Sequence, residues 1–234
     1  MANIFEKQGD FRVLCLGDIV ARPGRTLLKQ ALPKLKERCA LDMVIANGEN
    51  ASGGVGLDLK TGNEILACGV DVITLGDHVW RRKDVAQFLK KSPAICVRPG
   101  NFASTAPGSG AIRWTHSSGV EVGIFNLLGR TFMNIALDCP FQTVDGYLEN
   151  ELKGASIIIG DIHAEASSEK VALGRHLDGK ISLLFGTHTH IPTADEQILP
   201  GGTAYVTDLG MCGSQSGVIG LDAKIALERF LTGL

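Results

Sequence analysis

The sequence Ile181-Ser182-Leu183-Leu184-Phe185-Gly186-Thr187-His188-Thr189-His190 joins an apolar run to two histidines that alternate with threonine. The run over residues 180–185 predicts a short buried strand that ends at Gly186. In extended backbone, residues two apart point to the same side, so His188 and His190 should aim at one point. Ligand sites of open α/β sheets form just beyond the carboxyl ends of the strands. Two ordinary loop histidines are the competing interpretation of this motif alone.

Polar clusters of the same kind follow other predicted strands. The predicted strands cover 11–16, 42–46, 71–75, 94–98 and 156–159, and predicted helices over 22–39, 59–68 and 83–91 separate the first four. This alternation indicates parallel strands with right-handed crossovers. The candidate ligands after these strands are Asp18, Glu49, Asn50, Asp77, His78 and His163. Because the carboxyl ends of parallel strands meet at one edge, we expect these side chains to converge with His188 and His190.

Each candidate has a plainer interpretation when it is taken alone. Asp18 could cap a helix N-terminus, Glu49 could be a surface charge, and His163 could be a hydrogen-bonded structural histidine. The shared site is favoured because four of the six histidines follow predicted strands. Oxygen and imidazole ligands without thiolates are typical of zinc, manganese or iron sites. The donors outnumber the ligands of one tetrahedral ion, so we expect two ions.

The second half of the chain follows a different order. Hairpins are predicted for 111–116 with 121–127 and for 194–199 with 203–207, helices for 144–152, 167–177 and 221–231, and an irregular segment for 130–141. No linker-like tract interrupts the chain. We therefore expect a single domain over residues 1–234, with residues 1–10 as an N-terminal extension. Two mixed sheets packed face to face, with helices outside, fit this order of elements.

Composition limits the expected partners and location. The formal net charge of −2 does not indicate the excess of basic residues that is typical of proteins that bind duplex nucleic acid. The six cysteines are scattered without C-x-x-C spacing, which suits a reducing cytoplasm. No apolar run approaches the roughly 18 residues of a membrane span. The first residues also lack the apolar core of a signal peptide, so we expect a cytoplasmic protein without a membrane partner.

The motifs resemble those of a known enzyme superfamily, the calcineurin-like metallophosphoesterases. They read Leu16-Gly17-Asp18, Asn47-Gly48-Glu49-Asn50, Leu75-Gly76-Asp77-His78 and Gly186-Thr187-His188-Thr189-His190. Longer strings over 17–25, 45–54, 163–170, 186–195 and 199–205 resemble the YmdB-type bacterial phosphodiesterases, and the resemblance covers nearly the whole chain. It implies a four-layer α/β/β/α sandwich with two mixed β-sheets. It also implies a di-iron or di-manganese centre, with zinc as an alternative, that hydrolyses phosphodiesters such as 2′,3′-cyclic nucleotides.

The resemblance also implies a role for each site residue. One ion would be bound by Asp18, Asn50 and His190, the other by Asp77, His163 and His188, with Glu49 bridging them. A metal-bridging hydroxide would attack phosphorus, and His78 would protonate the leaving oxygen. Asn101, Gly53 and Gly54 are candidates for substrate contacts, although each could equally form a turn. Glu165 and Glu169 are candidates to orient the ligand histidines.

One motif departs from the family pattern, which normally reads Gly-Asn-His where this chain has Gly76-Asp77-His78. Because Asp77 adds a negative charge, we predict a raised His78 pKa, a less acidic bridging water and tighter metal retention. The alternative is that Asp77 behaves like asparagine. Two alternative functions stay open. One is a metal-binding regulatory protein with little turnover, and the other is a phosphomonoesterase. The expected partner is a small phosphodiester or nucleotide, with RNA ends and a homo-oligomer left open.

Overall fold

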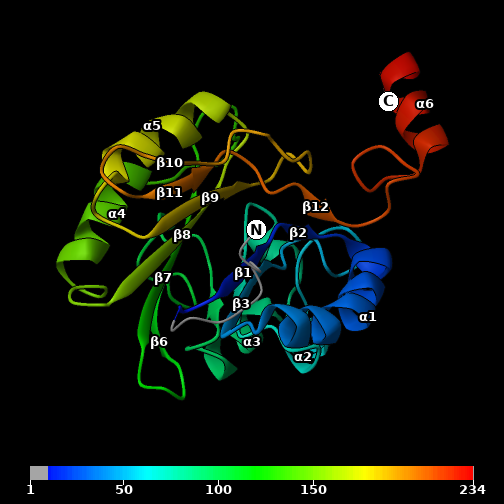
Figure 1. Ribbon diagram of the computed structural model, residues 1–234. Helices are drawn as coiled ribbons and strands as arrows, with labels where there is room; N and C mark the ends of the chain where they lie inside the picture. Colours follow the sequence, from blue (N-terminus) through cyan, green and yellow to red (C-terminus); the bar gives the residue numbers. More distant parts are fainter. Residues whose placement is uncertain (1–9, 234) are drawn as a thin grey trace.

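The computed structural model describes residues 10–233, and its first sheet has four parallel strands (Figure 1). Their order is β1 (Val13–Leu16), β3 (Met43–Asn47), β4 (Val72–Thr74) and β5 (Cys96–Val97). The helices between them are α1 (Ala21–Cys39), α2 (Leu59–Ala67) and α3 (Val85–Lys91), with a short η1 (Val79–Arg81) after β4. The predicted alternation of strand and helix is confirmed. The expected extension over 1–10 lies outside the described residues except for Asp10.

The second sheet is mixed and has six strands. Their order is β10 (Gln197–Ile198), β11 (Ala204–Val206), β9 (Leu183–Thr187), β8 (Ile157–His163), β7 (Glu121–Leu128) and β6 (Ala111–Thr115). The antiparallel pairs β6–β7 and β10–β11 are the two predicted hairpins, and the strands between them are parallel. A small parallel pair of β2 (Asp18–Ile19) and β12 (Met211–Cys212) ties the C-terminal region to the start of the chain.

Three buried clusters define four layers. Met43 and Ile45 of β3 pack with Ile159 and Phe185 of the second sheet, so the two sheets face each other. The alternate β3 residues Val44 and Ala46 pack instead in the cluster shared with α1, α2 and α3. On the far side, α4 (Pro140–Glu149) and α5 (Ser167–Leu177) cover the second sheet (Figure 1). The predicted α/β/β/α sandwich is confirmed.

The structure corrects three predicted boundaries. Helix α4 begins at Pro140, inside the segment that we predicted to be irregular, because proline fits the first helical position. Strand β8 runs on to His163, beyond the predicted end at residue 159, since Gly160 to His163 pair with both β7 and β9. Strand β9 likewise ends at Thr187 rather than at Gly186. In β8 and β9 the apolar run covers only the first part of the strand, because the hydrogen bonds between neighbouring strands continue through buried polar residues.

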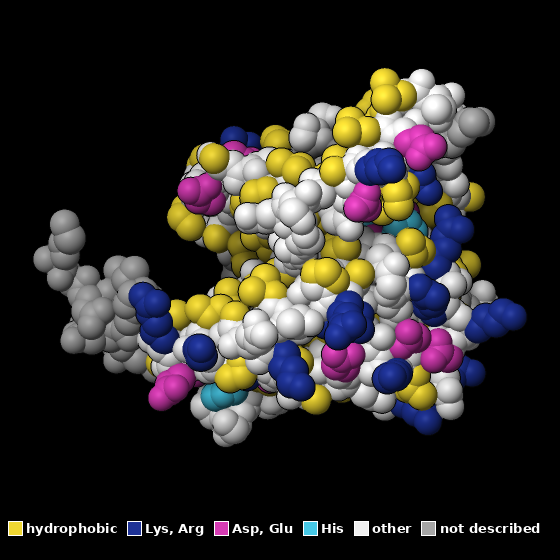
Figure 2. All heavy atoms as spheres, turned by 90° about the vertical axis from the view of Figure 1, so that its right-hand side faces the viewer, with side chains coloured by type: hydrophobic (Ala, Val, Ile, Leu, Met, Phe, Trp, Pro, Cys, Tyr) yellow, Lys and Arg dark blue, Asp and Glu magenta, His cyan; other side chains and the backbone are white. Residues whose placement is uncertain are grey.

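The last helix, α6 (Ala223–Thr232), projects from the body of the molecule (Figure 1). Its N-terminus is capped by Asp222, whose side chain accepts hydrogen bonds from the amides of Lys224 and Ile225. Figure 2 views the side of the molecule on which α1 and α6 lie, and shows a hollow with hydrophobic side chains along its walls. Among residues 10–233, no helix combines the length and apolarity needed to cross a membrane.

Candidate metal centre

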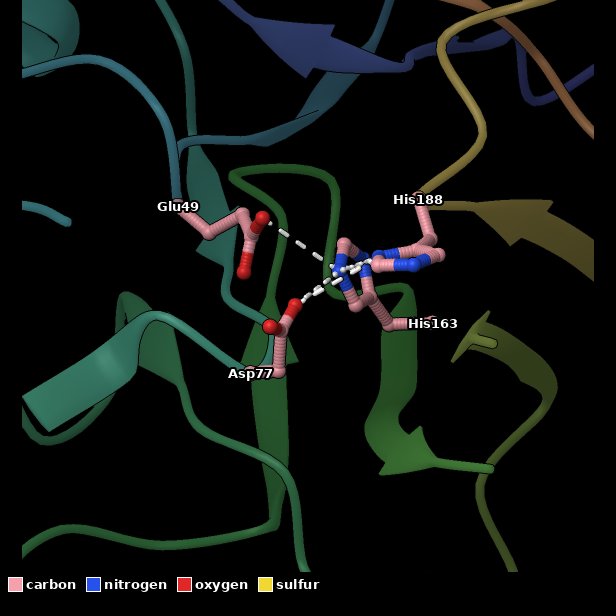
Figure 3. Close-up of side chains that lie close together, drawn as sticks. All are labelled: Glu49, Asp77, His163 and His188. Atoms are coloured by element: carbon pink, nitrogen blue, oxygen red, sulfur yellow. Dashed lines mark hydrogen bonds and ion pairs between the residues drawn. The ribbon is translucent and has the colours of Figure 1, made fainter. Parts of the chain in front are cut away.

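Four side chains converge between the two sheets and could hold one ion (Figure 3). Glu49, Asp77, His163 and His188 each offer one ligand atom, and these atoms all lie within 4.8 Å of one another. The Nε2 atom of His163 lies 3.1 Å from Asp77 Oδ1 and 3.3 Å from Glu49 Oε1. The Nδ1 atom of His188 lies 3.0 Å from His163 Nε2. These residues are the second ligand set that the resemblance implied, together with the bridging glutamate.

The other implied ligand set also comes together, around the amide of Asn50. Its Nδ2 atom lies 2.8 Å from Glu49 Oε1, 3.0 Å from His190 Nε2 and 3.5 Å from Asp18 Oδ1. The amide nitrogen therefore stands among the donors that this set would offer to an ion. A half-turn of the amide group would exchange the nitrogen for Oδ1 and present an oxygen ligand instead. The two sets share Glu49, as a bridging ligand requires.

The strand ends of both sheets position these side chains. Glu49 and Asn50 follow β3, and Asp77 follows β4 of the first sheet. His163 ends β8, and His188 follows β9 of the second sheet. The predicted strand ends do converge, but the centre lies where the carboxyl edges of two sheets meet and not at the edge of one parallel sheet.

The backbone around His188 and His190 differs from the prediction. His188 has φ = 102° and His190 has φ = 66°, so the segment is not extended, and the reason that we gave for their convergence is wrong. Such left-handed residues cost of order 1–3 kcal/mol each unless their surroundings hold them. Asp208 provides this support, because its Oδ2 accepts hydrogen bonds from the amide and hydroxyl of Thr189 at 3.2 and 2.9 Å.

Each ligand histidine is oriented by a partner on its other ring nitrogen. His190 Nδ1 lies 2.8 Å from the carbonyl oxygen of Ile219, and His188 Nε2 lies 3.1 Å from Glu165 Oε2. His163 Nδ1 lies 2.8 Å from the hydroxyl of Thr187. Each contact leaves the opposite nitrogen facing the centre, which is the arrangement that holds histidine ligands in metal sites. The role expected of Glu165 therefore agrees with its position.

Buried negative charge is the main electrostatic feature of the centre. Asp18 is 0% and Glu49 is 1% exposed, and among residues 10–233 the ion-pair partners of both are histidines. Burial favours a neutral Glu49, but His163 and His78 outweigh it and lower the Glu49 pKa to about 2. Burial likewise opposes a charge on His163, yet Glu49 and Asp77 raise its pKa well above the usual value. Cations at this position would balance the carboxylates in place of these protons, so the donor set fits divalent metals.

His78 lies beside both ligand sets and keeps contact with solvent. Its backbone amide donates to Glu49 Oε2 at 3.0 Å, and its Nδ1 lies 2.9 Å from Asn50 Oδ1. The His78 side chain is 28% exposed. The contact of the ring with the Glu49 carboxylate, whose Oε1 lies 3.2 Å from Nδ1, raises the His78 pKa, while burial acts in the opposite direction. A histidine with a raised pKa keeps its proton to higher pH, which suits a general acid.

The remaining predicted residues have mixed outcomes. Gly53 and Gly54 line a cavity of about 520 Å³ next to His78, which is large enough for a nucleotide. The buried Asn101 side chain bonds the backbone of Leu128 and Asp138 and does not line this cavity, so nothing in its position supports a substrate contact. Glu169 was wrongly predicted. It accepts hydrogen bonds from backbone amides that include that of Arg130, not from a ligand histidine.

Four buried polar residues near the centre were missed by the sequence analysis. They are Asp161, Lys170, Thr187 and Asp208. Asp161, Thr187 and Asp208 follow the predicted strands 156–159, 180–186 and 203–207, as the candidate ligands do, but Asp161 and Thr187 lie within the observed strands β8 and β9, and Lys170 lies in α5. Their position after a strand was therefore an available signal that we did not use. Ile219, Leu221 and Arg229 also line the cavity of about 520 Å³. Arg229 lies in the string 229–232, which also resembles the family, but we had named none of the three as a substrate contact.

Gly76 leaves the space in which Glu49 and His163 meet. A Cβ atom at this position would overlap Oε2 of Glu49 and Nε2 of His163. We expect Gly76→Ala to lower the amount of bound metal and to reduce activity by about 10²-fold or more, because the ligands can no longer approach each other. Elemental analysis of the purified variant measures the first effect. Gly146→Ala in α4 is the matched control, since a Cβ atom there meets nothing within 4 Å, and wild-type metal content in Gly76→Ala would contradict the expectation.

Comparisons with known proteins identify related chains. A family model described as YmdB-like protein matches residues 14–234. The 2′,3′-cyclic-nucleotide 2′-phosphodiesterase of Bacillus subtilis (strain 168) is 44% identical over 95% of this chain and 83% of its own length. A putative phosphatase/phosphodiesterase of Mycoplasma pneumoniae is 37% identical over 95% of this chain and 80% of its own length.

Two solved structures share the fold. A hypothetical protein from Thermus thermophilus has a TM-score of 0.90 and 42% identity, covering 96% of this chain and 86% of that one. A novel phosphatase from Mycoplasma pneumoniae has a TM-score of 0.89 and 35% identity, covering 96% of this chain and 80% of that one. The matches therefore include nearly all of this chain, with the sandwich and the candidate metal centre.

Proposed function

The chain belongs to the YmdB-like protein family, and from this premise we propose that it is a metal-dependent phosphodiesterase that opens 2′,3′-cyclic nucleotides. The observation that carries the proposal is the convergence of Glu49, Asp77, His163 and His188 next to a cavity of nucleotide size. Glu49 is buried, Asp77 is partly buried, and the histidines are oriented by outside partners, which supports a cation site rather than a chance cluster. The enzyme is a hydrolase.

We propose that the centre holds two ions. Asp77, His163 and His188 would bind one, Asp18, Asn50 and His190 the other, and Glu49 would bridge them. Iron or manganese are the metals that we propose, with zinc as the alternative, because the donors are oxygen and imidazole without thiolate. When bound, the ions would supply an activated water and neutralise charge on the phosphate.

The residues of the chain would perform the other parts of the reaction. Opening a 2′,3′-cyclic phosphate adds the oxygen of water to phosphorus and breaks the bond from phosphorus to O2′. His78 would donate a proton to O2′ as this bond breaks, leaving a 2′-hydroxyl and a 3′-phosphate. Glu165 would hold His188 through its Nε2 atom, and the loop with Gly53 and Gly54 would form one wall of the substrate cavity.

The test of this function is hydrolysis by enzyme loaded with Mn²⁺ or Fe²⁺. The substrates are a panel of 2′,3′-cyclic nucleotides, bis-p-nitrophenyl phosphate and p-nitrophenyl phosphate. We expect diesters to be hydrolysed faster than the monoester. A faster monoester reaction would favour a phosphatase, which is one of the two activities in the name of the Mycoplasma pneumoniae relative. A metal-loaded protein without turnover would favour the regulatory alternative.

Two further parts of the proposal concern location and other substrates. The six cysteines are free thiols, which supports a cytoplasmic protein. RNA ends with a 2′,3′-cyclic phosphate carry the same reacting group and are the second substrate class to assay. Self-association stays open, and the elution volume of the purified chain would decide it.

The negative charge of Asp77 should set the pH dependence of the reaction. Asp77 contributes to the raised His78 pKa, so Asp77→Asn should lower this pKa. A general acid must be protonated, and a lower pKa means that the proton is lost at lower pH. We therefore expect the alkaline limb of the pH–rate profile to move to lower pH, and metal to be retained less tightly. An unchanged profile with unchanged metal content would mean that Asp77 behaves like asparagine.

A further inference from the structure

Asp161 is a buried carboxylate between the two sheets that belongs to neither proposed ligand set and does not line the cavity of about 520 Å³. Its Oδ2 atom accepts hydrogen bonds from Thr74 Oγ1 at 2.5 Å and from Asn47 Nδ2 at 3.0 Å, both on the first sheet. Its Oδ1 atom accepts from Thr187 Oγ1 at 2.7 Å, on the second sheet. Asp161 is 0% exposed. Three side chains from both sheets therefore fix the orientation of this carboxylate.

The hydroxyl of Thr187 connects Asp161 to the ligand His163. A hydroxyl has one proton, and Thr187 donates it to Asp161. The same oxygen lies 2.8 Å from His163 Nδ1, and toward this nitrogen it can therefore act only as an acceptor. Asn47 Nδ2 lies 3.0 Å from Asp161 Oδ2, 3.3 Å from Thr187 Oγ1 and 3.5 Å from His163 Nδ1, so its two protons have nearer acceptors than the imidazole nitrogen. It follows that Nδ1 of His163 carries a proton, and that Nε2 is the nitrogen left for an ion.

We propose that Asp161 is a positioning residue that acts through Thr187 to fix the ring of His163 and the nitrogen that it offers to the metal. This inference rests on the proposed function, because it concerns the ion bound by Asp77, His163 and His188. The series of hydrogen bonds runs from the Asp161 carboxylate through the Thr187 hydroxyl to the His163 imidazole. It places Nε2 of His163 at 3.1 Å from Asp77 Oδ1 and 3.0 Å from His188 Nδ1. Partners of this kind typically change metal affinity 10–100-fold when they are lost.

Variants of Thr187 separate this role from a merely structural one. Thr187→Val keeps the shape of the side chain but removes the acceptor of the His163 proton. Thr187→Ser keeps the hydroxyl and removes only a methyl group. We expect Thr187→Val and Asp161→Asn to bind one Mn²⁺ about 10–100-fold more weakly in calorimetric titration of metal-free protein. Thr187→Ser should bind both ions with close to wild-type affinity.

A spectroscopic measurement adds a readout that does not depend on turnover. In Co²⁺-loaded protein, the visible absorption bands report the ligand geometry, so they should change in Thr187→Val and Asp161→Asn but not in Thr187→Ser. Asp71→Asn is the matched control, since Asp71 accepts a hydrogen bond from the amide of Val44 at the start of β3, away from the carboxyl edge. This control should lower the melting temperature without changing Mn²⁺ affinity.

Several results would overturn the proposal. Wild-type affinity and spectrum in Thr187→Val would show that the hydroxyl does not orient His163. Equal losses of Mn²⁺ affinity in Thr187→Ser and Thr187→Val would assign the effect to packing. An Asp161→Asn variant that differs from the wild type only in melting temperature would make Asp161 a structural residue. Because the titration needs no substrate, a wild type that binds two ions without hydrolysis would reject the proposed function and leave this inference standing. A wild type that binds no ion would overturn both.

Discussion

Replacing His78 with alanine is expected to lower kcat for 2′,3′-cyclic nucleotides by about 10²–10⁴-fold, which is the usual contribution of a positioned general acid. The amount of bound metal should stay at the wild-type level, because His78 belongs to neither ligand set. Alanine retains the backbone amide that donates to Glu49 Oε2 and removes only the ring contacts with Glu49 Oε1 at 3.2 Å and Asn50 Oδ1 at 2.9 Å. Steady-state kinetics of the metal-loaded variant, together with elemental analysis, measure both effects.

The leaving group distinguishes proton donation from other roles of His78. A p-nitrophenolate departs without much help from an acid, whereas a ribose oxygen needs a proton as its bond to phosphorus breaks. The loss in His78→Ala should therefore be much smaller for bis-p-nitrophenyl phosphate than for a cyclic nucleotide. His176→Ala is the control, because His176 pairs with Asp145 in the outer helical layer. Equal losses with both substrates would contradict the assignment of His78 as the acid.

The candidate ligands were recognisable from sequence because each follows a predicted strand. The rule that carboxyl ends share an edge accounts for Asp18, Glu49 and Asp77, which follow strands of the first sheet. It does not by itself bring His163 to them, because β8 belongs to the second sheet and the two edges meet only through the packing of the sheets. The layers could be predicted for a similar reason, since the alternation of strand and helix in the first half leaves few topologies. These properties depend on the order of elements and not on individual contacts.

The features that could not be predicted from sequence depend on contacts between segments that lie far apart along the chain. The left-handed backbone at His188 and His190 is held by Asp208, and nothing in the motif indicates that partner. Asn101 and Glu169 have side chains suited to substrate or histidine contacts, but backbone groups of remote loops take up their hydrogen bonds. Residues that support a site were harder to recognise than the ligands, because they lie inside elements and their role appears only when neighbours are placed.

Lys170→Met is expected to destabilise the fold by about 3–5 kcal/mol, the usual loss when one partner of a buried ion pair is removed. Lys170 is 0% exposed, and its Nζ atom lies 2.7 Å from both Asp208 Oδ2 and the carbonyl oxygen of Thr187. Methionine fills a similar volume but leaves the Asp208 carboxylate buried without its cation. For a chain of this size the loss corresponds to a fall in melting temperature of about 6–20 °C.

An exposed lysine in this protein provides the control for that stability effect. Lys180 lies 3.6 Å from Asp145 with its side chain 48% exposed, so Lys180→Met should cost no more than about 1 kcal/mol. Equal melting temperatures of Lys170→Met and Lys180→Met would contradict the importance of the buried pair. The double variant Lys170→Met/Asp208→Asn should lose less than the sum of its single changes, because the unpaired charge is also removed.

The buried ion pair should also affect metal binding through the backbone that it supports. Lys170 holds the carbonyl of Thr187, and Asp208 holds Thr189, so the pair fixes both neighbours of His188. Added Mn²⁺ stabilises the native protein in proportion to its affinity for the folded state. The rise in melting temperature at a given Mn²⁺ concentration should therefore be smaller in Lys170→Met than in Lys180→Met. An equal rise in the two variants would mean that the pair stabilises the sandwich without holding the histidine segment.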